Sequence, residues 1–489
     1  MGNIVAVRQK NHDDASETAL TMLKTTSTND VEFYGIASSR SIQTRQDLQQ
    51  LGTPRLGSST IIGYAFTRIL EQDRPQPLKT KDATVAFDGR TYPTDMPCVD
   101  AQAFAQQLPE KNKEYAALKF IKEADGDFTF VIAEPERLVV GRDPLGVRPL
   151  YYGENKVFAA VASDRKTLWN VNIESVHSFP PGKVAIVDGS GFKFRLAKRL
   201  THPIPRQLSM KTAAQRLQIM VEQAVKERLR SLREAAVAFS GGLDSSIIAF
   251  LSKKSETNVQ LIHVSLEDQF ETEHARVAAD ELKLPIQVRT YNEEDVSRTL
   301  PAVLRAIEEP DPVKASIGIP IYWASEQAAK MNLRVMLAGQ GSDELFAGYK
   351  RYVDQFVNEG SEAATATVFN DIIRMHESNL ERDFKICNSL GIELRLPFAS
   401  WQIAKFAVDL PVELKIQPFD DTLRKLVLRQ AALNSRLPES MANRPKKAIQ
   451  YATGVNSVLK KLANKNGLTV KKYMQKTFRI AMKGITPHA

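Results

Sequence analysis

The chain has 489 residues, of which 43% are hydrophobic and 25% charged, as expected for a folded globular protein of two or three domains. No apolar run approaches the roughly 18 residues that cross a bilayer, and no signal peptide is recognisable, so we expect a cytoplasmic protein without a membrane partner. The two cysteines, Cys98 and Cys387, lie far apart, and the seven histidines show no paired spacing. This pattern argues against disulfides and against zinc or iron–sulfur sites.

The formal charge of +9 comes from the C-terminal end of the chain. From Asn443 onward there are eleven Lys or Arg and no Asp or Glu, and the remainder is slightly acidic. Such a tail is typical of a nucleic-acid-binding surface, of an electrostatic funnel for an anionic nucleotide, or of a solvated helix face. Aromatic residues are too sparse for a base-stacking platform, so nucleic acid is the least favoured partner.

The pattern of the first 200 residues predicts short strands and turns with a few helices. A helix is expected at residues 16–23. Strands are expected at residues 3–7, 126–132, 137–142, 156–162, 183–187 and 192–196. Because Asp-Gly, Pro and Gly turns separate these strands as in an antiparallel meander, the sequence predicts an α+β sandwich for residues 1–200.

Two segments of this region, GDFTF at 126–130 and GRDPLGVRPLYY at 141–152, resemble the Ntn-hydrolase-like glutaminase domain of class II amidotransferases. In that family the nucleophile is a cysteine at position two, with its own α-amine as the base. Here position two is Gly2, and the glutamine-holding Asn-Gly-Glu of the family has its nearest counterpart in Asp88-Gly89-Arg90. The family's arginine corresponds best to Arg68. The resemblance therefore implies a domain that retains the fold but is inactive as a glutaminase.

Residues 197–207 contain two prolines and predict a linker, so that a second domain spans residues 208–489. It is expected to open with a long amphipathic helix and a buried strand at residues 235–239. Further strands and helices then alternate through residues 259–266, 275–284, 286–291 and 333–338. This alternation predicts a doubly wound parallel sheet that binds ligands at the carboxyl ends of its strands, followed by a mostly helical part.

The segment Ser-Gly-Gly-Leu-Asp-Ser-Ser at residues 240–246 lies between the expected strand and the next helix. Backbone N–H groups and a helix N-terminus favour phosphate at such a turn, and the glycines allow a close approach. No Gly-Lys-Ser/Thr follows, so this is not a Walker-type loop. The alternative is an ordinary tight turn. The segment resembles the SGGxDS loop of ATP pyrophosphatases, which cleave ATP to AMP and pyrophosphate.

Four more segments resemble asparagine synthetases in order and spacing, and the likeness is strongest to the archaeal-type branch. They are residues 314–322, 337–349, 390–398 and 444–451. Together with the Ser-Gly-Gly loop, they extend the resemblance over nearly the whole chain. It implies ATP-dependent conversion of aspartate to asparagine through a β-aspartyl-AMP intermediate, with ammonia either free or supplied by a separate glutaminase.

The resemblance also implies the roles of individual residues. Nucleotide-binding residues are Ser240, Gly241, Gly242, Asp244, Ser245, Val264, Ser265, Leu266 and Gly339. The substrate-binding residues are Lys314, Ser316 and Asp343. Because charge develops on the departing pyrophosphate, the reaction needs Mg²⁺, and the matching carboxylates are Asp244 and Asp343. Lys446 matches the family lysine that steadies the phosphates as a mobile point charge.

Two positions depart from the family. Gln340 stands where many members have a glutamate base, and an amide cannot accept the proton of the attacking ammonia. Gln340 is thus expected to orient the intermediate, while Glu344 or a phosphate oxygen substitutes as the base. Lys314 stands where an arginine often clamps a carboxylate in two-point fashion. A synthetase acting on another carboxylate, or a non-catalytic nucleotide- or RNA-binding relative, therefore remains an alternative, and a homo-oligomer is compatible with each.

Overall fold

The computed structural model describes residues 1–26, 30–52, 54–92, 101–202, 207–418, 423–445 and 448–485. The chain divides into two compact units. The first is Met1–Arg199 together with a short segment from Met482 onward, and the second is Leu200–Ala481. Within the described ranges, no helix has both the length and the apolar character that a membrane span requires.

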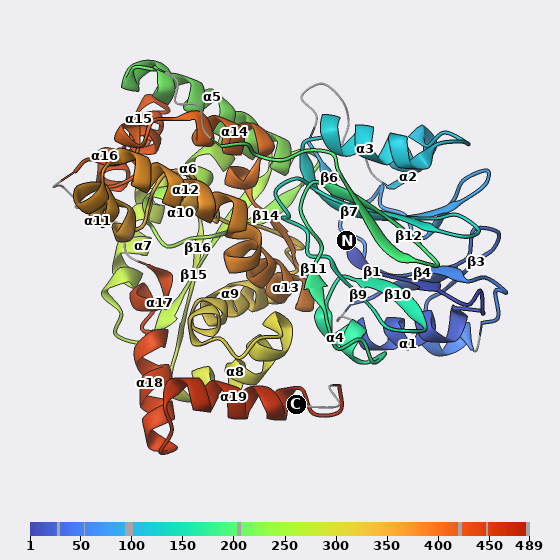
Figure 1. The fold of residues 1–489 in the computed structure, drawn as a ribbon. Helices are drawn as coiled ribbons and strands as arrows, with labels where there is room; N and C mark the ends of the chain where they lie inside the picture. Colours follow the sequence, from blue (N-terminus) through green and yellow to red (C-terminus); the bar gives the residue numbers. More distant parts are fainter. Residues whose placement is uncertain are drawn as a thin grey trace. The chain divides into compact units, whose positions relative to one another are not determined.

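Two antiparallel sheets form the N-terminal unit (Figure 1). The seven-stranded sheet has the order β11 (His177–Ser178), β9 (Tyr151–Glu154), β10 (Phe158–Ala162), β1 (Gly2–Gln9), β4 (Thr60–Phe66), β2 (Phe33–Ala37), β3 (Ile42–Arg45). The six-stranded sheet has the order β13 (Gly191–Leu196), β12 (Lys183–Asp188), β8 (Leu138–Arg142), β7 (Gly126–Ala133), β6 (Thr84–Thr91), β5 (Leu78–Lys79). The α+β sandwich that the turn pattern predicts is present.

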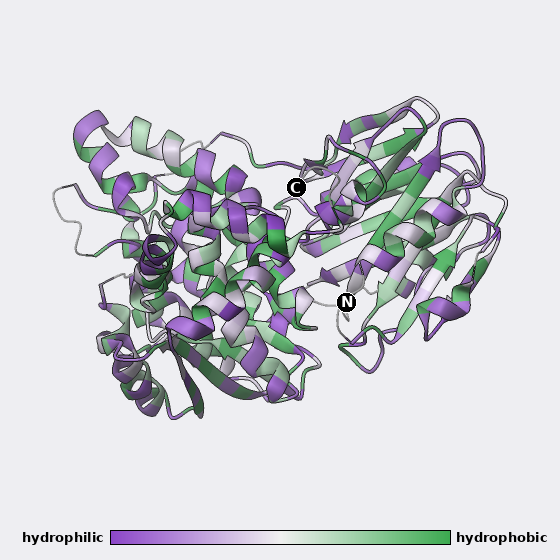
Figure 2. Ribbon diagram, turned by 90° about the horizontal axis from the view of Figure 1, so that it is seen from below, coloured by the Kyte–Doolittle hydropathy of each residue, from purple (hydrophilic) through white to green (hydrophobic). Residues whose placement is uncertain are grey.

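A core of small and branched side chains fills the space between the two sheets. It includes Ile4, Ile62 and Val161 of the first sheet and Val131, Val140 and Val187 of the second. Outside the first sheet lie α1 (Ser16–Thr26) and α4 (Arg165–Trp169), and outside the second lie α2 (Ala101–Gln107) and α3 (Lys113–Glu123). Because successive side chains of a strand point to opposite faces, each sheet contributes to two cores. The strands are accordingly mostly green in Figure 2.

A five-stranded parallel sheet forms the centre of the second unit. Its order is β16 (Ile286–Tyr291), β15 (Asn258–Leu266), β14 (Glu234–Ala238), β17 (Val335–Leu337), β18 (Glu393–Arg395). The chain starts at the central strand, runs to one edge and then to the other, which is the predicted doubly wound arrangement. β18 lies in the part that the sequence predicts to be mostly helical, because three residues are too few to show an alternating pattern.

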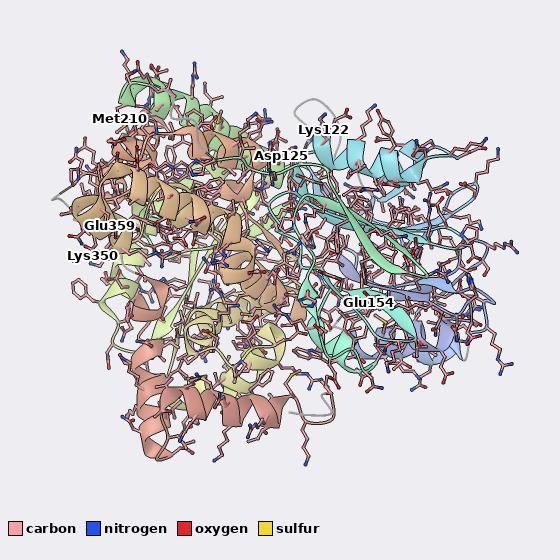
Figure 3. All side chains as sticks on the ribbon, viewed as in Figure 1. Lys122, Asp125, Glu154, Met210, Lys350 and Glu359 are labelled. Atoms are coloured by element: carbon pink, nitrogen blue, oxygen red, sulfur yellow. The ribbon has the colours of Figure 1, made fainter. Side chains whose placement is uncertain are left out.

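The helices of this unit cover both faces of the sheet and form its C-terminal part; Figure 3 labels Lys350 and Glu359, the two ends of α11. They are α5 (Met210–Leu229), α6 (Leu243–Ser252), α7 (Phe270–Leu282), α8 (Glu293–Ile307), α9 (Pro312–Lys330), α10 (Ser342–Leu345), α11 (Lys350–Glu359), α12 (Ser361–Met375), α13 (Glu381–Ser389), α14 (Trp401–Asp409), α15 (Leu426–Asn434), α16 (Glu439–Ala442), α17 (Ile449–Ala452), α18 (Val455–Lys465) and α19 (Val470–Ala481).

The basic tail is largely helical and occupies α18 and α19. Lys461 and Lys465 of α18 form ion pairs with Glu293 at the start of α8, at 2.6 and 2.5 Å. Part of the positive charge is therefore neutralised within the second unit, which favours a solvated helix face over a surface reserved for an anionic partner.

Candidate functional site

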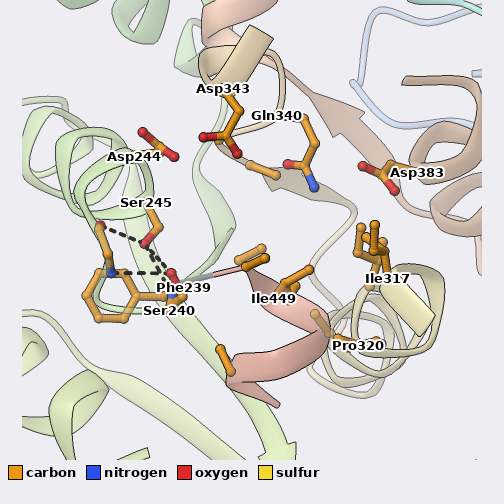
Figure 4. Close-up of a pocket in the computed structure, with 18 of the residues that line it drawn as sticks. Phe239, Ser240, Asp244, Ser245, Ile317, Pro320, Gln340, Asp343, Asp383 and Ile449 are labelled. Atoms are coloured by element: carbon orange, nitrogen blue, oxygen red, sulfur yellow. Dashed lines mark hydrogen bonds between the residues drawn. The ribbon is translucent and has the colours of Figure 1, made fainter. Parts of the chain in front are cut away.

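A cavity of about 300 Å³ lies at the carboxyl ends of the central strands of the second unit. The strand order reverses between β14 and β17, and the crevice at such a reversal is where doubly wound sheets bind ligands. One side of the cavity is apolar and is lined by Ala238, Ile262, Val264, Pro320, Ile321, Ala324 and Ile449. The other side carries the turn after β14 and a row of polar side chains (Figure 4).

The turn between β14 and α6 is held together by its own serines. The N–H of Ser240 donates to the Ser245 hydroxyl at 3.2 Å, and that hydroxyl donates to the carbonyl of Gly242 at 3.2 Å. Gly241 has a φ of 68°, in the left-handed region that glycine adopts without strain. Among the described residues, no side chain caps the N-terminus of α6, so its first N–H groups remain available to an anion.

The ammonium group of Lys425 is the centre of the polar side. It lies 2.6 and 2.7 Å from the carboxylate oxygens of Asp244 and 2.7 Å from Oδ1 of Asp343, and it donates to the Ser342 hydroxyl at 2.7 Å. Burial opposes the charge, but Asp244 and Asp343 outweigh it and raise the pKa of Lys425. Lys425 is not predictable as a site residue from sequence, because nothing in its local pattern distinguishes it from a surface lysine.

Two glycines leave room for this cluster. A Cβ at Gly339 would lie 2.8 Å from the Cβ of Asp244. A Cβ at Gly348 would lie 2.1 Å from Oδ1 of Asp343 and 2.4 Å from Cε of Lys425. Any side chain at either position would therefore displace the charged groups, so the backbone can pass this close to them only as glycine.

The donor set of the cluster fits a magnesium ion. Mg²⁺ takes one or two carboxylates together with phosphate oxygens, and Asp244 and Asp343 already converge on one cationic group. Over the described ranges, no group of three or more His, Cys, Asp or Glu side chains is placed to hold a metal. An ion at this point would therefore take its remaining ligands from a bound nucleotide and water.

Gln340 and Asp383 continue the polar wall beyond Asp343 (Figure 4). The amide of Gln340 donates to the Asp383 carboxylate, which also pairs with Arg382 at 2.6 Å. Burial raises the pKa of Asp383, and Arg382 opposes that rise. Asp383 is not predictable as a site residue from sequence, because it lies within α13, and carboxylates are common on the solvated faces of helices.

Glu344 lies next to Asp343 in sequence and is 2% exposed. Its Oε1 accepts hydrogen bonds from the Tyr349 hydroxyl and from the Asn379 amide, both at 2.5 Å. Burial, followed by the charge of Asp343, raises the pKa of Glu344. A carboxyl group with a raised pKa is better matched to proton transfer near neutral pH than an exposed one.

The structure brings together most of the predicted nucleotide-binding residues. Ser240, Gly242, Asp244, Ser245, Val264 and Gly339 line the cavity, and Gly241 belongs to the same turn. Ser265 and Leu266 are not among the lining residues: the Ser265 hydroxyl bonds to Thr272 at 2.8 Å, and the Leu266 N–H donates to the carbonyl of Thr453 at 3.1 Å.

Only one of the three predicted substrate-binding residues lies at the cavity. Asp343 lines the cavity, whereas Lys314 and Ser316 do not. The ammonium of Lys314 pairs with Glu309 at 2.5 Å, and the Ser316 hydroxyl donates to a backbone carbonyl of its own helix. Lys446, the expected phosphate-steadying lysine, lies outside the described residues.

In the N-terminal unit, the position of the family's nucleophile leaves no space for a side chain. A Cβ at Gly2 would lie 2.3 Å from the carbonyl oxygen of Ala65 and 2.4 Å from the ring of Tyr64. The N–H of Gly2 donates to Asp88 at 2.9 Å. Because the tyrosine ring occupies the volume where a thiol would stand, a cysteine could enter only if Tyr64 moved.

The neighbouring pocket of this unit is also filled by protein. Arg90, at the position of the family's glutamate, is 4% exposed and bonds to both carboxylate oxygens of Asp73, at 2.6 and 2.7 Å. Arg68 pairs with Glu32 at 3.3 Å. The remaining cavity is about 20 Å³, which is room for a water molecule and not for glutamine.

Two family models match the chain. The model described as "Asparagine synthase" matches residues 216–366 and 356–478, which together are more than half of the chain. The model described as "Glutamine amidotransferase domain" matches residues 67–170. These ranges fall on the two units that carry the cavity and the sandwich, respectively.

Curated proteins and solved structures give further likenesses. A Methanocaldococcus jannaschii protein named "Putative asparagine synthetase (glutamine-hydrolyzing) 1" is 31% identical, over 72% of this chain and 73% of that protein. The human protein named "Asparagine synthetase (glutamine-hydrolyzing)" is 28% identical over 68% of this chain, but the match spans 64%, less than two thirds, of its own length. Glutamine phosphoribosylpyrophosphate amidotransferase from B. subtilis is 13% identical over 58% of this chain and 65% of its own, with a TM-score of 0.33.

Proposed function

Since the chain belongs to the asparagine synthase family, we propose that it is an ATP-dependent ligase that forms AMP and pyrophosphate and converts aspartate to asparagine with ammonia. One observation carries this proposal. Asp244 and Asp343, which follow the adjacent parallel strands β14 and β17, meet on one cation beside a turn rich in N–H donors. Cations held at that point stabilise the charge that develops on departing pyrophosphate.

The first step activates the acid. The adenine of ATP lies against the apolar side of the cavity, and its phosphates lie on the Ser240–Ser245 turn. The side-chain carboxylate of aspartate attacks the α-phosphorus, and the bond to pyrophosphate breaks, which leaves an acyl-adenylate. Asp244 and Asp343 would hold Mg²⁺ here, and the ion would neutralise charge on the phosphates. The residues of the cavity hold both reactants in one orientation, which removes much of the entropic barrier.

The second step transfers nitrogen. Ammonia attacks the activated carbonyl carbon, the bond to AMP breaks, and a proton leaves the attacking nitrogen. Gln340 cannot take that proton and instead orients the intermediate while it bonds to Asp383. Glu344, whose pKa is raised by burial and by Asp343, is the carboxylate assigned to accept the proton.

Ammonia, free or from a separate glutaminase, is the proposed nitrogen donor. The support comes from the N-terminal unit, where Gly2 replaces the family's cysteine and Tyr64 occupies the space next to it. The ion pair of Arg90 with Asp73 fills the adjoining pocket. Both features oppose glutamine hydrolysis, although the relatives named above are described as glutamine-hydrolysing.

A second acceptor is favoured by one observation. Lys314 pairs with Glu309 and does not line the cavity. The cation that is expected to bind the α-carboxylate of aspartate is therefore not in the cavity wall. The same adenylation chemistry on a different carboxylate is therefore the alternative function.

The proposal is tested by exchange of labelled pyrophosphate into ATP, with Mg²⁺ and each of a panel of carboxylic acids. Aspartate-dependent exchange, together with asparagine formed from ammonium, is the expected result. Asp343→Asn should lower exchange by about 100-fold or more, whereas Asp354→Asn, at an exposed position of α11, should not. Exchange driven only by another acid selects the second function, and formation of ADP with any acid rejects both.

A further inference from the structure

His263 of β15 is a buried imidazole that takes no part in the chemistry proposed above. It is 4% exposed and lines the cavity. Its Nδ1 bonds to the carbonyl oxygen of Phe239 at 2.9 Å, and since a carbonyl only accepts, Nδ1 carries the proton. Its Nε2 has no hydrogen-bond partner within the described part of the chain. A buried acceptor without a partner raises the free energy of the folded state, so a ligand that bonds to this nitrogen would be favoured.

The imidazole lies next to the turn that follows β14. β15 runs parallel to β14, and Ile262 is paired with Ala238, which places His263 beside the residue that precedes the turn. Three charged groups act on it, namely Glu271 and Arg276 of α7 and Arg444. Arg444 donates to the carbonyl of Gly241 at 2.9 Å and pairs with Glu271.

A phosphate group at this place would change the charge of His263. Burial lowers the pKa of His263, and the bond to Phe239 offsets only part of that effect, so the ring is neutral and Nε2 is an acceptor. A polyphosphate bound with Mg²⁺ also offers only acceptor oxygens. Two acceptors cannot form a hydrogen bond with each other. One proton on Nε2 makes it a donor, so that a charge-assisted hydrogen bond forms, and a nearby anion favours the protonated ring.

We propose that His263 takes up one proton when ATP binds and donates a hydrogen bond from Nε2 to the polyphosphate. The proton comes from solvent and returns to it when pyrophosphate leaves, so the net reaction is unchanged. His263 is thus a phosphate-binding residue whose positive charge exists only while the anion is present. Lys425, by contrast, is already committed to two carboxylates. The inference rests on the proposed function only in requiring that ATP enters this cavity.

Isothermal titration in two buffers of different ionisation heat measures the proton uptake directly. We expect close to one proton per Mg·ATP and per Mg·pyrophosphate at pH 7.5, and none for adenosine. Over the pH range in which the ring changes charge on binding, the affinity for ATP should weaken about tenfold for each unit by which the pH rises.

His263→Asn is the test variant, because its amide can still donate to Phe239 while nothing replaces Nε2. The proton uptake should disappear, and the pH dependence of ATP affinity should flatten. His274→Asn is the matched control, since His274 lies at an exposed position of the adjacent helix α7, and it should keep the wild-type uptake.

The possible outcomes distinguish a failure of the proposed function from a failure of the role proposed for His263. If the wild-type protein does not bind ATP, the proposed function itself fails. If it binds ATP without proton uptake, or if His263→Asn takes up as many protons as wild type, only the role of His263 is refuted. Uptake with adenosine alone would assign the imidazole to the base or ribose and refute phosphate binding. Nitrogen NMR of the wild-type imidazole with and without pyrophosphate gives the same answer if the variant does not fold.

Discussion

The ammonium group of Lys425 touches both carboxylate oxygens of Asp244, at 2.6 and 2.7 Å. The same group lies 2.7 Å from Asp343, so one buried lysine holds two carboxylates together at the point proposed for Mg²⁺. The lysine is therefore a monovalent counterion built into the chain, and its removal should make the stability of the fold depend on a divalent ion.

Lys425→Met should lower the free energy of unfolding by about 1–3 kcal/mol without metal, because two half-buried carboxylates lose their shared partner. Mg²⁺ should recover part of this loss in the variant and change the wild type less. Urea denaturation with and without magnesium chloride measures both effects. Lys330→Met removes an exposed lysine that pairs with Glu326, and it should cost well under 1 kcal/mol. Equal responses of the Lys425 variant and wild type to Mg²⁺ would contradict the counterion role.

Gly2→Cys should not create a glutaminase. The new Cβ meets the Ala65 carbonyl and the Tyr64 ring, so we expect a loss of about 1–3 kcal/mol from overpacking. Thermal unfolding and glutamate release from glutamine are the two measurements. The double change Gly2→Cys with Tyr64→Ala provides the comparison, because it relieves the ring contact while Arg90 still fills the pocket. Glutamate released by the single variant would show that the site is not occluded.

Lys415→Met should stabilise the protein most at low pH. Lys415 is buried, its amine donates to the Ala407 carbonyl at 2.6 Å, and burial lowers its pKa from 10.5 to about 7. Between these two values the unfolded chain binds more protons than the folded one, so the wild type gains stability as pH rises from about 7 to 10.5. The advantage of the variant should be on the order of 4 kcal/mol at pH 6 and should vanish above about pH 11.

Urea unfolding across this pH range measures that difference. Lys405→Met is the matched control, because Lys405 lies at an exposed position of α14, the helix whose Ala407 carbonyl accepts the bond from Lys415. An advantage of Lys415→Met that is constant with pH would mean that packing, rather than the buried charge, explains it.

Gln340→Glu should not restore a base, although it recreates the family's residue. The present amide donates a hydrogen bond to Asp383, and a second carboxylate there would repel the first. The pKa values of both groups should rise, so the variant should lose about 1–3 kcal/mol at pH 7.5 and regain stability as the pH falls toward 4.5. Unfolding at both pH values, with the exposed Gln475→Glu as control, tests this. A faster ammonia-dependent reaction in the variant would contradict it.

The sequence by itself determined the two architectures and the position of the Ser-Gly-Gly turn. Short strands separated by turn residues in the first half, strand–helix alternation in the second and a Ser-Gly-Gly turn after a buried strand are local patterns, because each is encoded within a few residues. Asp244 and Asp343 could be placed for the same reason, since each lies six residues beyond a strand that ends at the same edge of the sheet.

Only the tertiary structure decided which charges meet at that edge. Lys425 is separated from Asp244 by 181 positions, and no local period links them. Lys314 was expected at the cavity but is neutralised by Glu309, a neighbour in its own segment. The ion pairs of Lys425, and the clash that keeps a side chain out of Gly2, depend on which distant elements pack together, and packing is a property of the whole fold.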